Sequence, residues 1–383
     1  MKPFDCVVIG AGPAGATAAY HLARLGRSVA VLERQKLPRY KPCGGGVSPE
    51  VQSWFDFDLE PAVSWRATRM RATWRMKDAV EGDIPNASVW MVRREVFDHF
   101  LVEKAAGIGA TVFDGLEATG LSPTEGGWRI ETGREPLDAR CVIAADGSKG
   151  QASKWLGFTE RKRRLAGAFE AEANLVKGQD GVIHLEFGMI RGGYLWNFPK
   201  SDAHSIGIGA FKGDAPKNMK ALLGDYCGGF GIDLASAAQH GHPVAVWNGA
   251  QRLHGRSCLL AGEAACLVDP FTAEGIRAAI LSGKLAAEAI HEALRGDSLA
   301  LARYSYQVHE RHGKDMAWAR RVSALFYAFP KVGYDFGVKD PSALAFMGKL
   351  LTGEARYRDI ARDGLAKLRG GLAARGRRAA HSP

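Results

Sequence analysis

The stretch RYKPCGGGVS, from Arg39 to Ser48, places one cysteine directly before three consecutive glycines. A thiol can supply a proton or change its oxidation state. Residues without a Cβ atom adopt unusual dihedral angles and leave room for a flat ring or a chain-like substrate against the backbone. The next residues, Ser48-Pro49-Glu50, have the N-cap, N1 proline and first-turn acid of a helix start. We therefore take Cys43 as the first candidate for catalysis, as a proton donor or a redox-sensitive gate, with simple packing as the alternative.

Aromatic residues recur at every second position in the segment GGYLWNFP, which ends at Pro199. A strand of this pattern carries Tyr194, Trp196 and Phe198 on one face, and Pro199 turns the chain into a returning strand, SIGIGAF. Such a face either belongs to the core of a sheet or forms an apolar wall for a substrate. Tyr194 and Trp196 join Cys43 as candidate catalytic residues, with Tyr194 as the second candidate proton donor.

The N-terminal segment has a pattern that binds dinucleotides. A short β-branched run, FDCVVI, leads into the turn GAGPAG at residues 10–15 and a helical pattern, and a second strand ends at Glu33. The first two glycines allow close approach to a pyrophosphate, the third lets helix pack on strand, and the helix N-terminus attracts the anion. Glu33 can accept hydrogen bonds from a ribose with a free 2′-hydroxyl, as in FAD or NAD. The predicted contacts here are Gly10, Gly12, Ala14, Gly15, Glu33 and Arg34.

Two later strands end in acidic residues. RCVIAADGSKG predicts a strand that ends at Asp146-Gly147, and SCLLAGEAACLVDPFTAEGI predicts another that ends at Gly262-Glu263. A helix should open near Gly275, and its N-terminal end would stabilise negative charge on a bound ligand.

The order of these segments resembles the FAD-dependent family that includes aromatic hydroxylases, flavin-dependent halogenases and geranylgeranyl reductases. PRYKPCGGG resembles the PxxKxCGGG pattern of the geranylgeranyl reductases, and YLWNFP followed by GIG resembles their YxWxFP…GxG signature. Halogenases have a related WxWxIP segment, so the aromatic segment alone does not exclude them. The cysteine-glycine loop is what favours a geranylgeranyl reductase over a halogenase. At Glu263 the chain departs from the aspartate usual in the family. Together the resemblance and the strand ends predict further cofactor contacts at Cys43, Gly44, Gly45, Arg94 (or its neighbour Arg93), Asp146, Gly147, Gly262, Glu263, Pro270, Gly275 and Ile276.

The resemblance implies a FAD-dependent oxidoreductase that saturates C=C double bonds of a geranylgeranyl or similar isoprenoid chain by hydride transfer from reduced flavin. No second GxGxxG occurs in a strand–helix setting, so we expect a transient electron donor, either NADPH or a small redox protein such as ferredoxin. A flavin-dependent halogenase or hydroxylase is the enzymatic alternative, although no segment identifies the lysine that halogenases need. A non-catalytic flavin- and lipid-binding protein is the alternative from another class.

The elements together predict an α/β (α+β) fold. We expect a discontinuous Rossmann-like FAD-binding domain at residues 1–60, 93–159 and 252–300. A mixed or antiparallel β-sheet domain for the substrate is expected at 61–92 and 160–251, followed by a helical C-terminal region at 301–383.

The composition sets further limits. The six cysteines of the 383-residue chain show no CxxC or CxxH spacing, so neither a disulfide framework nor a metal site is predicted, although one bond between Cys43 and Cys266 is conceivable. Because no apolar run is long enough to span a bilayer, we expect a cytoplasmic protein. The net charge is +10, and the last residues are basic behind an apolar stripe of Ala361, Leu365, Leu368 and Leu372. Two interpretations stay open for this end, a solvated or packed terminus and peripheral contact with anionic lipids at the inner membrane face; nucleic acid is not expected.

Overall fold

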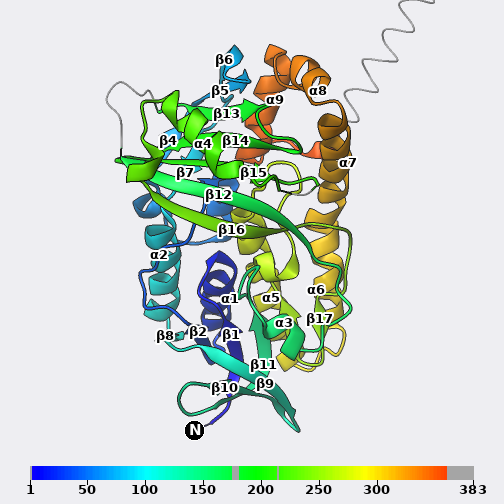
Figure 1. The fold of residues 1–383 in the computed structure, drawn as a ribbon. Coiled ribbons are helices and arrows are strands. Elements are labelled where there is room, and N and C mark those ends of the chain that lie inside the picture. Colours follow the sequence, from blue (N-terminus) through cyan, green and yellow to red (C-terminus); the bar gives the residue numbers. More distant parts are fainter. Residues whose placement is uncertain (1, 175–180, 214, 360–383) are drawn as a thin grey trace, which may run out of the picture.

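A parallel β-sheet forms the lower half of the molecule in Figure 1. The computed structural model describes residues 2–174, 181–213 and 215–359. The strand β1 runs through the buried segment FDCVVI and pairs with a parallel neighbour on each side, as expected of a short apolar run inside such a sheet. In spatial order the sheet contains β17 (His254–Gly255), β18 (Cys258–Leu260), β11 (Leu137–Ala144), β1 (Phe4–Ile9), β2 (Val29–Glu33) and β8 (Thr111–Asp114). Only β17 runs antiparallel on this path, and the hairpin of β9 (Ala118–Thr124) and β10 (Gly127–Thr132) continues from β11.

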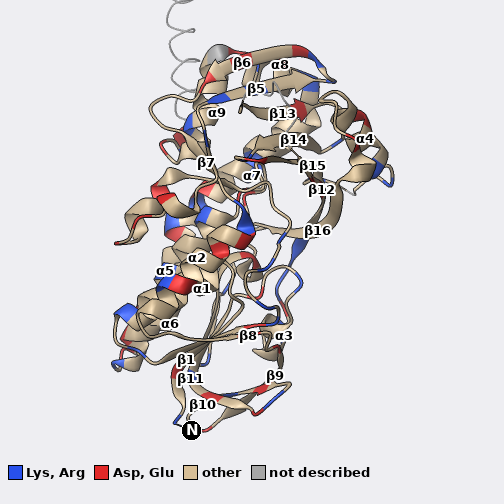
Figure 2. Ribbon diagram, turned by 90° about the vertical axis from the view of Figure 1, so that its left-hand side faces the viewer, with Lys and Arg blue, Asp and Glu red and all other residues tan. Residues whose placement is uncertain are grey.

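Helices cover one side of this sheet, as the turned view in Figure 2 shows. The helix α1 packs against α2 and α5. Its N-terminus follows β1 directly, which aims the glycine turn at the carboxyl end of the sheet. The helices of this half are α1 (Pro13–Arg24), α2 (Arg94–Gly107), α3 (Ala152–Trp155) and α5 (Ile276–Leu294), with the short 3₁₀ helices η1 (Pro49–Trp54), η2 (Glu60–Ala62) and η4 (Gly262–Ala265).

A second, mainly antiparallel sheet lies above the first (Figure 1). In spatial order it contains β16 (Ala238–Val246), β12 (Arg164–Asn174), β15 (Ala203–Ala210), β14 (Gly193–Pro199), β13 (Ile183–Phe187), β5 (Arg69–Trp74) and β6 (Lys77–Asp83). Only β13 and β5 pair in parallel. The helix α4 (Met219–Gly228) contacts β15, and η3 (Leu234–Ser236) precedes β16. A three-stranded sheet of β3 (Gly46–Val47), β7 (Val89–Met91) and β4 (Trp65–Ala67) begins directly after the cysteine-glycine loop.

The last helices run along the side of both halves and over the upper end (Figure 1). They are α6 (Ala300–Val308), a π-helical turn at His309–Gly313, α7 (Lys314–Ala328), α8 (Pro330–Gly337) and α9 (Pro341–Thr352). In the described part of the chain, none of the helices has the length and apolar character needed to cross a bilayer. The α/β fold class predicted from the sequence is confirmed, whereas the domain boundaries stay a prediction and the apolar stripe from Ala361 to Leu372 lies outside the described residues.

Candidate active site

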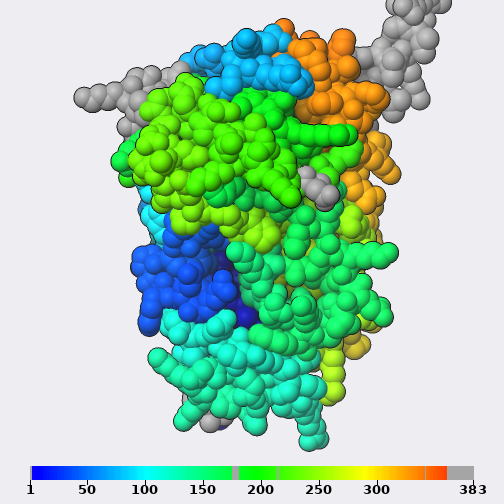
Figure 3. Space-filling model, in the orientation of Figure 1, coloured from blue at the N-terminus to red at the C-terminus, as the bar shows by residue number. Residues whose placement is uncertain are grey.

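A cavity of about 910 Å³ lies between the two halves. Its lining comes from the glycine turn, the cysteine-glycine loop, the end of β11 and the start of α5, and from the upper-sheet strands β12, β13, β14 and β16. On the face drawn in Figure 3, the surface is hollowed where the blue N-terminal segments meet the green ones. One chamber therefore joins the proposed dinucleotide cradle to the sheet proposed to hold the substrate.

The glycine turn has the geometry of an anion cradle. Gly10 has φ +102°, and a Cβ atom there would lie 2.5 Å from Ala145 O, so the position requires glycine. At Gly12, a Cβ atom would come within 3.8 Å of Arg39 Nη2 and 4.0 Å of Arg94 Nη2. The N-terminus of α1 and two guanidinium groups therefore surround the same point, an arrangement that suits a pyrophosphate. Gly15 does not line the cavity; a Cβ atom there would overlap Gly10 O, which fits its expected packing role.

Carboxylates hold both arginines in place. Asp98 is buried and binds Arg94 through two contacts of 2.7 Å, and its Oδ2 also lies 3.1 Å from Arg39 Nη1. Glu33 pairs with Arg39 Nε at 3.1 Å and accepts a hydrogen bond from Ala11 N at 3.1 Å. The sequence reasoning named Arg94 and missed Arg39, although Arg39 stands in the loop that it singled out. The available signal for Arg39 was its basic side chain in the loop that follows the second strand of the dinucleotide-binding pattern.

Arg93 and Arg94 have different environments. Arg94 is buried and lines the cavity, whereas Arg93 does not line it and pairs with Asp202 and Glu95 nearer the surface. Of the two arginines that the sequence left open, Arg94 is therefore the one placed to reach a ligand in the cavity.

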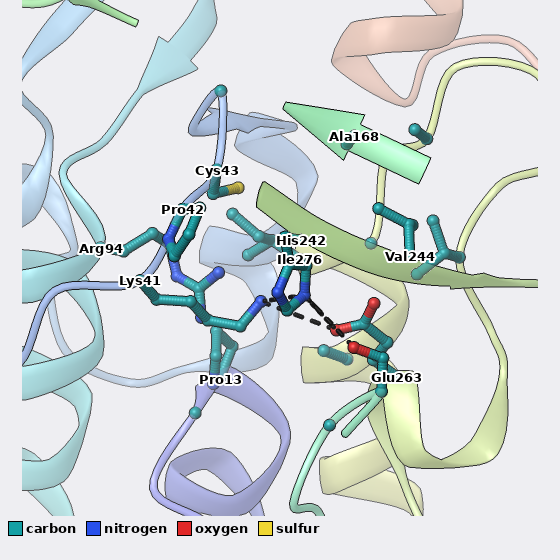
Figure 4. A pocket seen from close by; sticks show the side chains of 18 of the residues that line it. Pro13, Lys41, Pro42, Cys43, Arg94, Ala168, His242, Val244, Glu263 and Ile276 are labelled. Carbon is teal, nitrogen blue, oxygen red and sulfur yellow. Dashed lines mark hydrogen bonds and ion pairs between the residues drawn. The ribbon is translucent and has the colours of Figure 1, made fainter. Parts of the chain in front are cut away.

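Glu263 is the centre of a polar group beneath the upper sheet (Figure 4). Its Oε2 lies 3.6 Å from Lys41 Nζ and 3.6 Å from His242 Nε2, and its Oε1 accepts a hydrogen bond from Ala245 N at 3.1 Å. Burial by itself raises the pKa of Glu263, but Lys41, His242 and the Ala245 amide outweigh burial and lower this pKa to about 2. The carboxylate is therefore ionised at neutral pH. Through Lys41 and His242 it connects the lower half of the molecule with the cysteine-glycine loop and with β16. Lys41 and His242 were not predicted as site residues.

Asp146, the acidic residue that follows β11, has different hydrogen-bond partners from Glu263. Asp146 Oδ2 accepts a hydrogen bond from Ala152 N at 2.9 Å, while its buried Oδ1 has no hydrogen-bond partner among the described residues. Burial raises the pKa of Asp146. Asp146 lines the cavity, but this oxygen itself is buried and not open to solvent.

The cavity brings together most of the residues predicted from the sequence. Gly15, Gly262 and Pro270 do not line it, and the other predicted residues do. Those on the cavity wall are Gly10, Gly12, Ala14, Glu33, Arg34, Cys43, Gly44, Gly45, Arg94, Asp146, Gly147, Tyr194, Trp196, Glu263, Gly275 and Ile276.

Hydrogen bonds from two buried side chains, Glu170 and Lys200, fix the cysteine-glycine loop. Glu170 Oε1 on β12 accepts hydrogen bonds from Cys43 N at 2.6 Å and from Tyr40 Oη at 3.1 Å. Lys200 Nζ donates to Gly44 O at 2.5 Å and to Val92 O at 3.0 Å. Both charged side chains are buried, and burial raises the pKa of Glu170 and lowers the pKa of Lys200. Neither was predicted from the sequence, because Glu170 reaches the loop from β12 and Lys200 from the turn after β14.

The Cys43 thiol makes a hydrogen bond within its own loop. Gly45 N donates to Cys43 Sγ at 3.4 Å. Because the sulfur acts as an acceptor in this contact, its own hydrogen is left for another partner. The bond between Cys43 and Cys266 that the sequence left open is not formed: all six cysteines are described, and all are free thiols. Cys266 contacts Arg161 Nη2 at 3.3 Å and does not line the cavity.

The aromatic strand β14 faces the cavity as its period-two pattern predicted. Tyr194, Trp196 and Phe198 all line the cavity, with ring centroids 6.1 Å apart for the first pair and 6.3 Å for the second. Gly207 on β15 lies directly opposite Trp196, and a Cβ atom there would overlap the indole. Tyr194 Oη donates to Thr272 O, and burial raises the pKa of Tyr194, so the phenol stays protonated.

The end of the cavity near β14 is apolar. Besides the three aromatic residues, it is lined by Ile183, Leu185, Phe187, Phe211, Tyr327, Met347 and Leu351. Such a wall excludes water and binds a hydrocarbon chain without a fixed hydrogen-bonding pattern.

Comparisons with known proteins place the chain among FAD-dependent reductases. Residues 4–175 match the family described as FAD binding domain. The chain is 30% identical over 350 residues to digeranylgeranylglycerophospholipid reductase 2 of Methanopyrus kandleri, covering 84% of this chain and 86% of that protein. It is 30% identical over 384 residues to geranylgeranyl diphosphate reductase of Rhodobacter capsulatus, covering 91% and 93%.

Solved structures share the fold. A geranylgeranyl bacteriochlorophyll reductase-like protein of Thermoplasma acidophilum superposes with a TM-score of 0.78 at 22% identity, over 92% of both chains. A flavin-dependent brominase superposes with a TM-score of 0.73 at 18% identity, over 96% of this chain and 100% of that one. At these identities the likeness shows a common architecture and leaves the reaction to the site itself.

Proposed function

Since the chain belongs to the geranylgeranyl reductase family of FAD-dependent oxidoreductases, we propose that it saturates C=C double bonds in a geranylgeranyl or similar isoprenoid chain. The observation that carries the proposal is the single cavity, with a charged anion cradle at one end and an apolar, aromatic-walled chamber at the other. A hydrocarbon chain fits the second end and a dinucleotide fits the first.

The residues present fit FAD. The Gly10–Gly12 turn, the N-terminus of α1 and the guanidinium groups of Arg39 and Arg94 would hold the pyrophosphate, and Glu33 and Arg34 line the adjoining cavity. Reduced FAD supplies the hydride for one carbon of the double bond. The other residues must align the chain, exclude water and supply the proton for the second carbon.

We assign the aromatic wall to alignment. Tyr194, Trp196 and Phe198 present ring faces and edges to the chamber, which hold a flexible chain by dispersion and hydrophobic contact. Tyr194 is fixed by its hydrogen bond to Thr272 O, so its proton is already engaged.

We assign the proton to Cys43. Its sulfur already accepts from Gly45 N, and its backbone is pinned by Glu170, so the thiol hydrogen can point at the cavity. Transfer of this proton to the substrate carbon leaves a thiolate beside the buried cations Arg94 and Lys200, which both interact electrostatically with Cys43. A proton from solvent then restores the thiol.

The electron donor in this proposal visits from solution, as NADPH or as a small reduced protein such as ferredoxin. The domain division given above, with residues 61–92 and 160–251 as the substrate part, belongs to the same proposal.

The test is anaerobic reduction of the purified, FAD-loaded protein, followed by incubation with geranylgeranyl diphosphate or a geranylgeranylated lipid and mass spectrometry of the product. Mass gains in steps of two hydrogens are expected. Bound FAD that reduces normally and leaves both isoprenoids unchanged would refute the proposal. Parallel incubations with oxygen and bromide or an aromatic acceptor would then reveal a halogenase or hydroxylase, whereas no product in any arm would indicate a non-catalytic carrier.

A further inference from the structure

Four large apolar side chains are exposed on consecutive turns of α7 and α8. They are Leu325, Phe329, Val332 and Phe336, with exposed fractions of 69%, 62%, 56% and 80%. Leu325 lies in the last turn of α7, and Val332 and Phe336 lie one turn apart on α8. Because α7 ends at Ala328 and α8 begins at Pro330, Phe329 lies at the corner between the helices. We call these four residues the apolar ridge.

The opposite face of the same helices belongs to the chamber. Tyr327 lines the cavity, and Phe326 packs against Phe187 and Phe271. Tyr334 on α8 is fully buried against Trp74 and Phe187. A helix of a water-soluble protein normally has a polar outer face, so apolar residues on both faces indicate an outer partner. A layer one helix thick therefore separates that partner from the apolar chamber.

The charge around the ridge is positive. Residues 318–340 carry four basic residues, Arg320, Arg321, Lys331 and Lys339, and two acids, Asp335 and Asp340. Lys331 and Lys339 both pair with Asp78 in the turn between β5 and β6, Lys331 also pairs with Asp335, and the two arginines lie over tryptophan rings. Counting Asp78, the basic residues still outnumber the acids, as they do in the whole chain, whose net charge is +10. An apolar strip bordered by cations complements an anionic bilayer surface, in which side chains enter the acyl boundary and cations meet headgroups.

We propose that Leu325, Phe329, Val332 and Phe336 insert into the surface of an anionic lipid bilayer and hold the chamber next to the lipid phase. The inference deepens the proposed function, because an isoprenoid chain in a bilayer is separated from the chamber only by α7 and α8. Docking itself is a property of the surface and can be measured without turnover.

The experiment uses full-length, FAD-loaded protein and vesicles made of equal parts phosphatidylcholine and phosphatidylglycerol. The double variant Phe329→Ser/Phe336→Ser should bind the vesicles at least about tenfold more weakly than the unchanged protein in co-sedimentation. The matched control is Leu299→Ser/Tyr306→Ser, because these residues are 63% and 64% exposed and lie next to or on α6, away from the ridge. The control should bind like the unchanged protein.

Several outcomes overturn the proposal. The first is failure of the unchanged protein to co-sediment with the vesicles, and the second is an equal loss of binding in the two double variants. The third is binding that high salt abolishes but that the ridge variant retains, because such binding would depend on charge alone. A ridge variant that changes the molecular mass in light scattering but not the vesicle binding would assign the ridge to a second copy of the chain. Reduction of a water-soluble prenyl diphosphate by the ridge variant at the unchanged rate would show that the active site is intact, so failure of docking and failure of the proposed reaction remain distinguishable.

Discussion

Replacing Gly45 by alanine tests whether the cysteine-glycine loop needs its glycines for backbone geometry. Gly45 has φ +75°, and a Cβ atom there would overlap both Val92 O and Lys200 Nζ. The backbone cannot retreat easily, because Val92 N donates to Gly45 O at 2.9 Å and Lys200 is tied to Gly44 O. The substitution therefore strains the dihedral angle and overpacks a buried charged contact.

The two costs can be added in outline. A non-glycine residue in the left-handed region costs roughly 1–2 kcal/mol, and overpacking of a rigid site costs about 1–3 kcal/mol. We expect Gly45→Ala to lower the free energy of unfolding by about 2–5 kcal/mol. The matched control is Gly46→Ala, where the nearest atoms to a Cβ, Phe198 Cε2 and Val89 Cγ1, lie at ordinary contact distances of 3.9 and 4.0 Å and φ is not in the left-handed region. The control should change the free energy by less than about 1 kcal/mol.

Urea unfolding followed by tryptophan fluorescence measures both variants. Fluorescence titration with FAD, at a concentration of urea where both remain folded, shows whether the displaced loop also disturbs the cradle. Equal destabilisation by the two substitutions would refute the reasoning, because the three glycines would then matter only as flexible chain and not through the particular contacts of Gly45.

Three further predictions concern the charged and reactive groups of the cavity. Cys43→Ala should leave FAD bound and depress alkene reduction, measured as product mass after anaerobic reduction; unchanged turnover would remove the thiol from the mechanism. Arg39→Met should weaken FAD binding by about 10- to 100-fold in equilibrium titration, the value of a charge-assisted contact, whereas Arg129→Met, which breaks an exposed ion pair with Asp138, should leave it unchanged. The pKa of Glu263 in the folded protein, about 2, lies below the ordinary value, so its stabilisation is present above about pH 4.5 and is lost as the pH falls toward 2. Glu263→Gln should therefore lower the free energy of unfolding by up to about 3 kcal/mol at pH 7 and by less than half as much at pH 3, and a pH-independent loss would contradict the assigned ionisation.

The sequence predicted correctly those elements whose defining residues are adjacent in the chain. The glycine turn combines strand, turn and helix within residues 4–24, and the structure reproduces each part. The Ser48 N-cap is present as well, with the Ser48 hydroxyl accepting from Glu50 N, although the helix that follows is a 3₁₀ helix. In these cases backbone preference and hydrogen bonding within a few residues decide the conformation.

The residues that the sequence reasoning missed are brought in by long-range strand pairing. Glu170, Lys200 and His242 reach the loop from β12, from the turn after β14 and from β16. Their positions depend on the register of a seven-stranded sheet, in which Gly167 pairs with Ala210 and with Pro243. A shift of one residue in that register would turn each side chain to the other face. No spacing in the sequence reports such a register, whereas Arg39 and Lys41 stood within the recognised loop and were open to prediction.

The two signature segments of the chain, about 150 residues apart, form one wall. A Cβ atom on Gly44 would lie 2.8 Å from the Phe198 ring and 3.3 Å from Trp196 Nε1, so the loop glycine makes room for the aromatic strand. Gly207 in turn lies under the indole of Trp196 from the neighbouring strand. The indole is thus bounded by glycine on two sides, and the absent Cβ atoms set where the ring can lie. The glycines of CGGG and GxG therefore act in the same way as the aromatic residues of YxWxFP: they fix the depth of the chamber, and a change on either side must be compensated on the other.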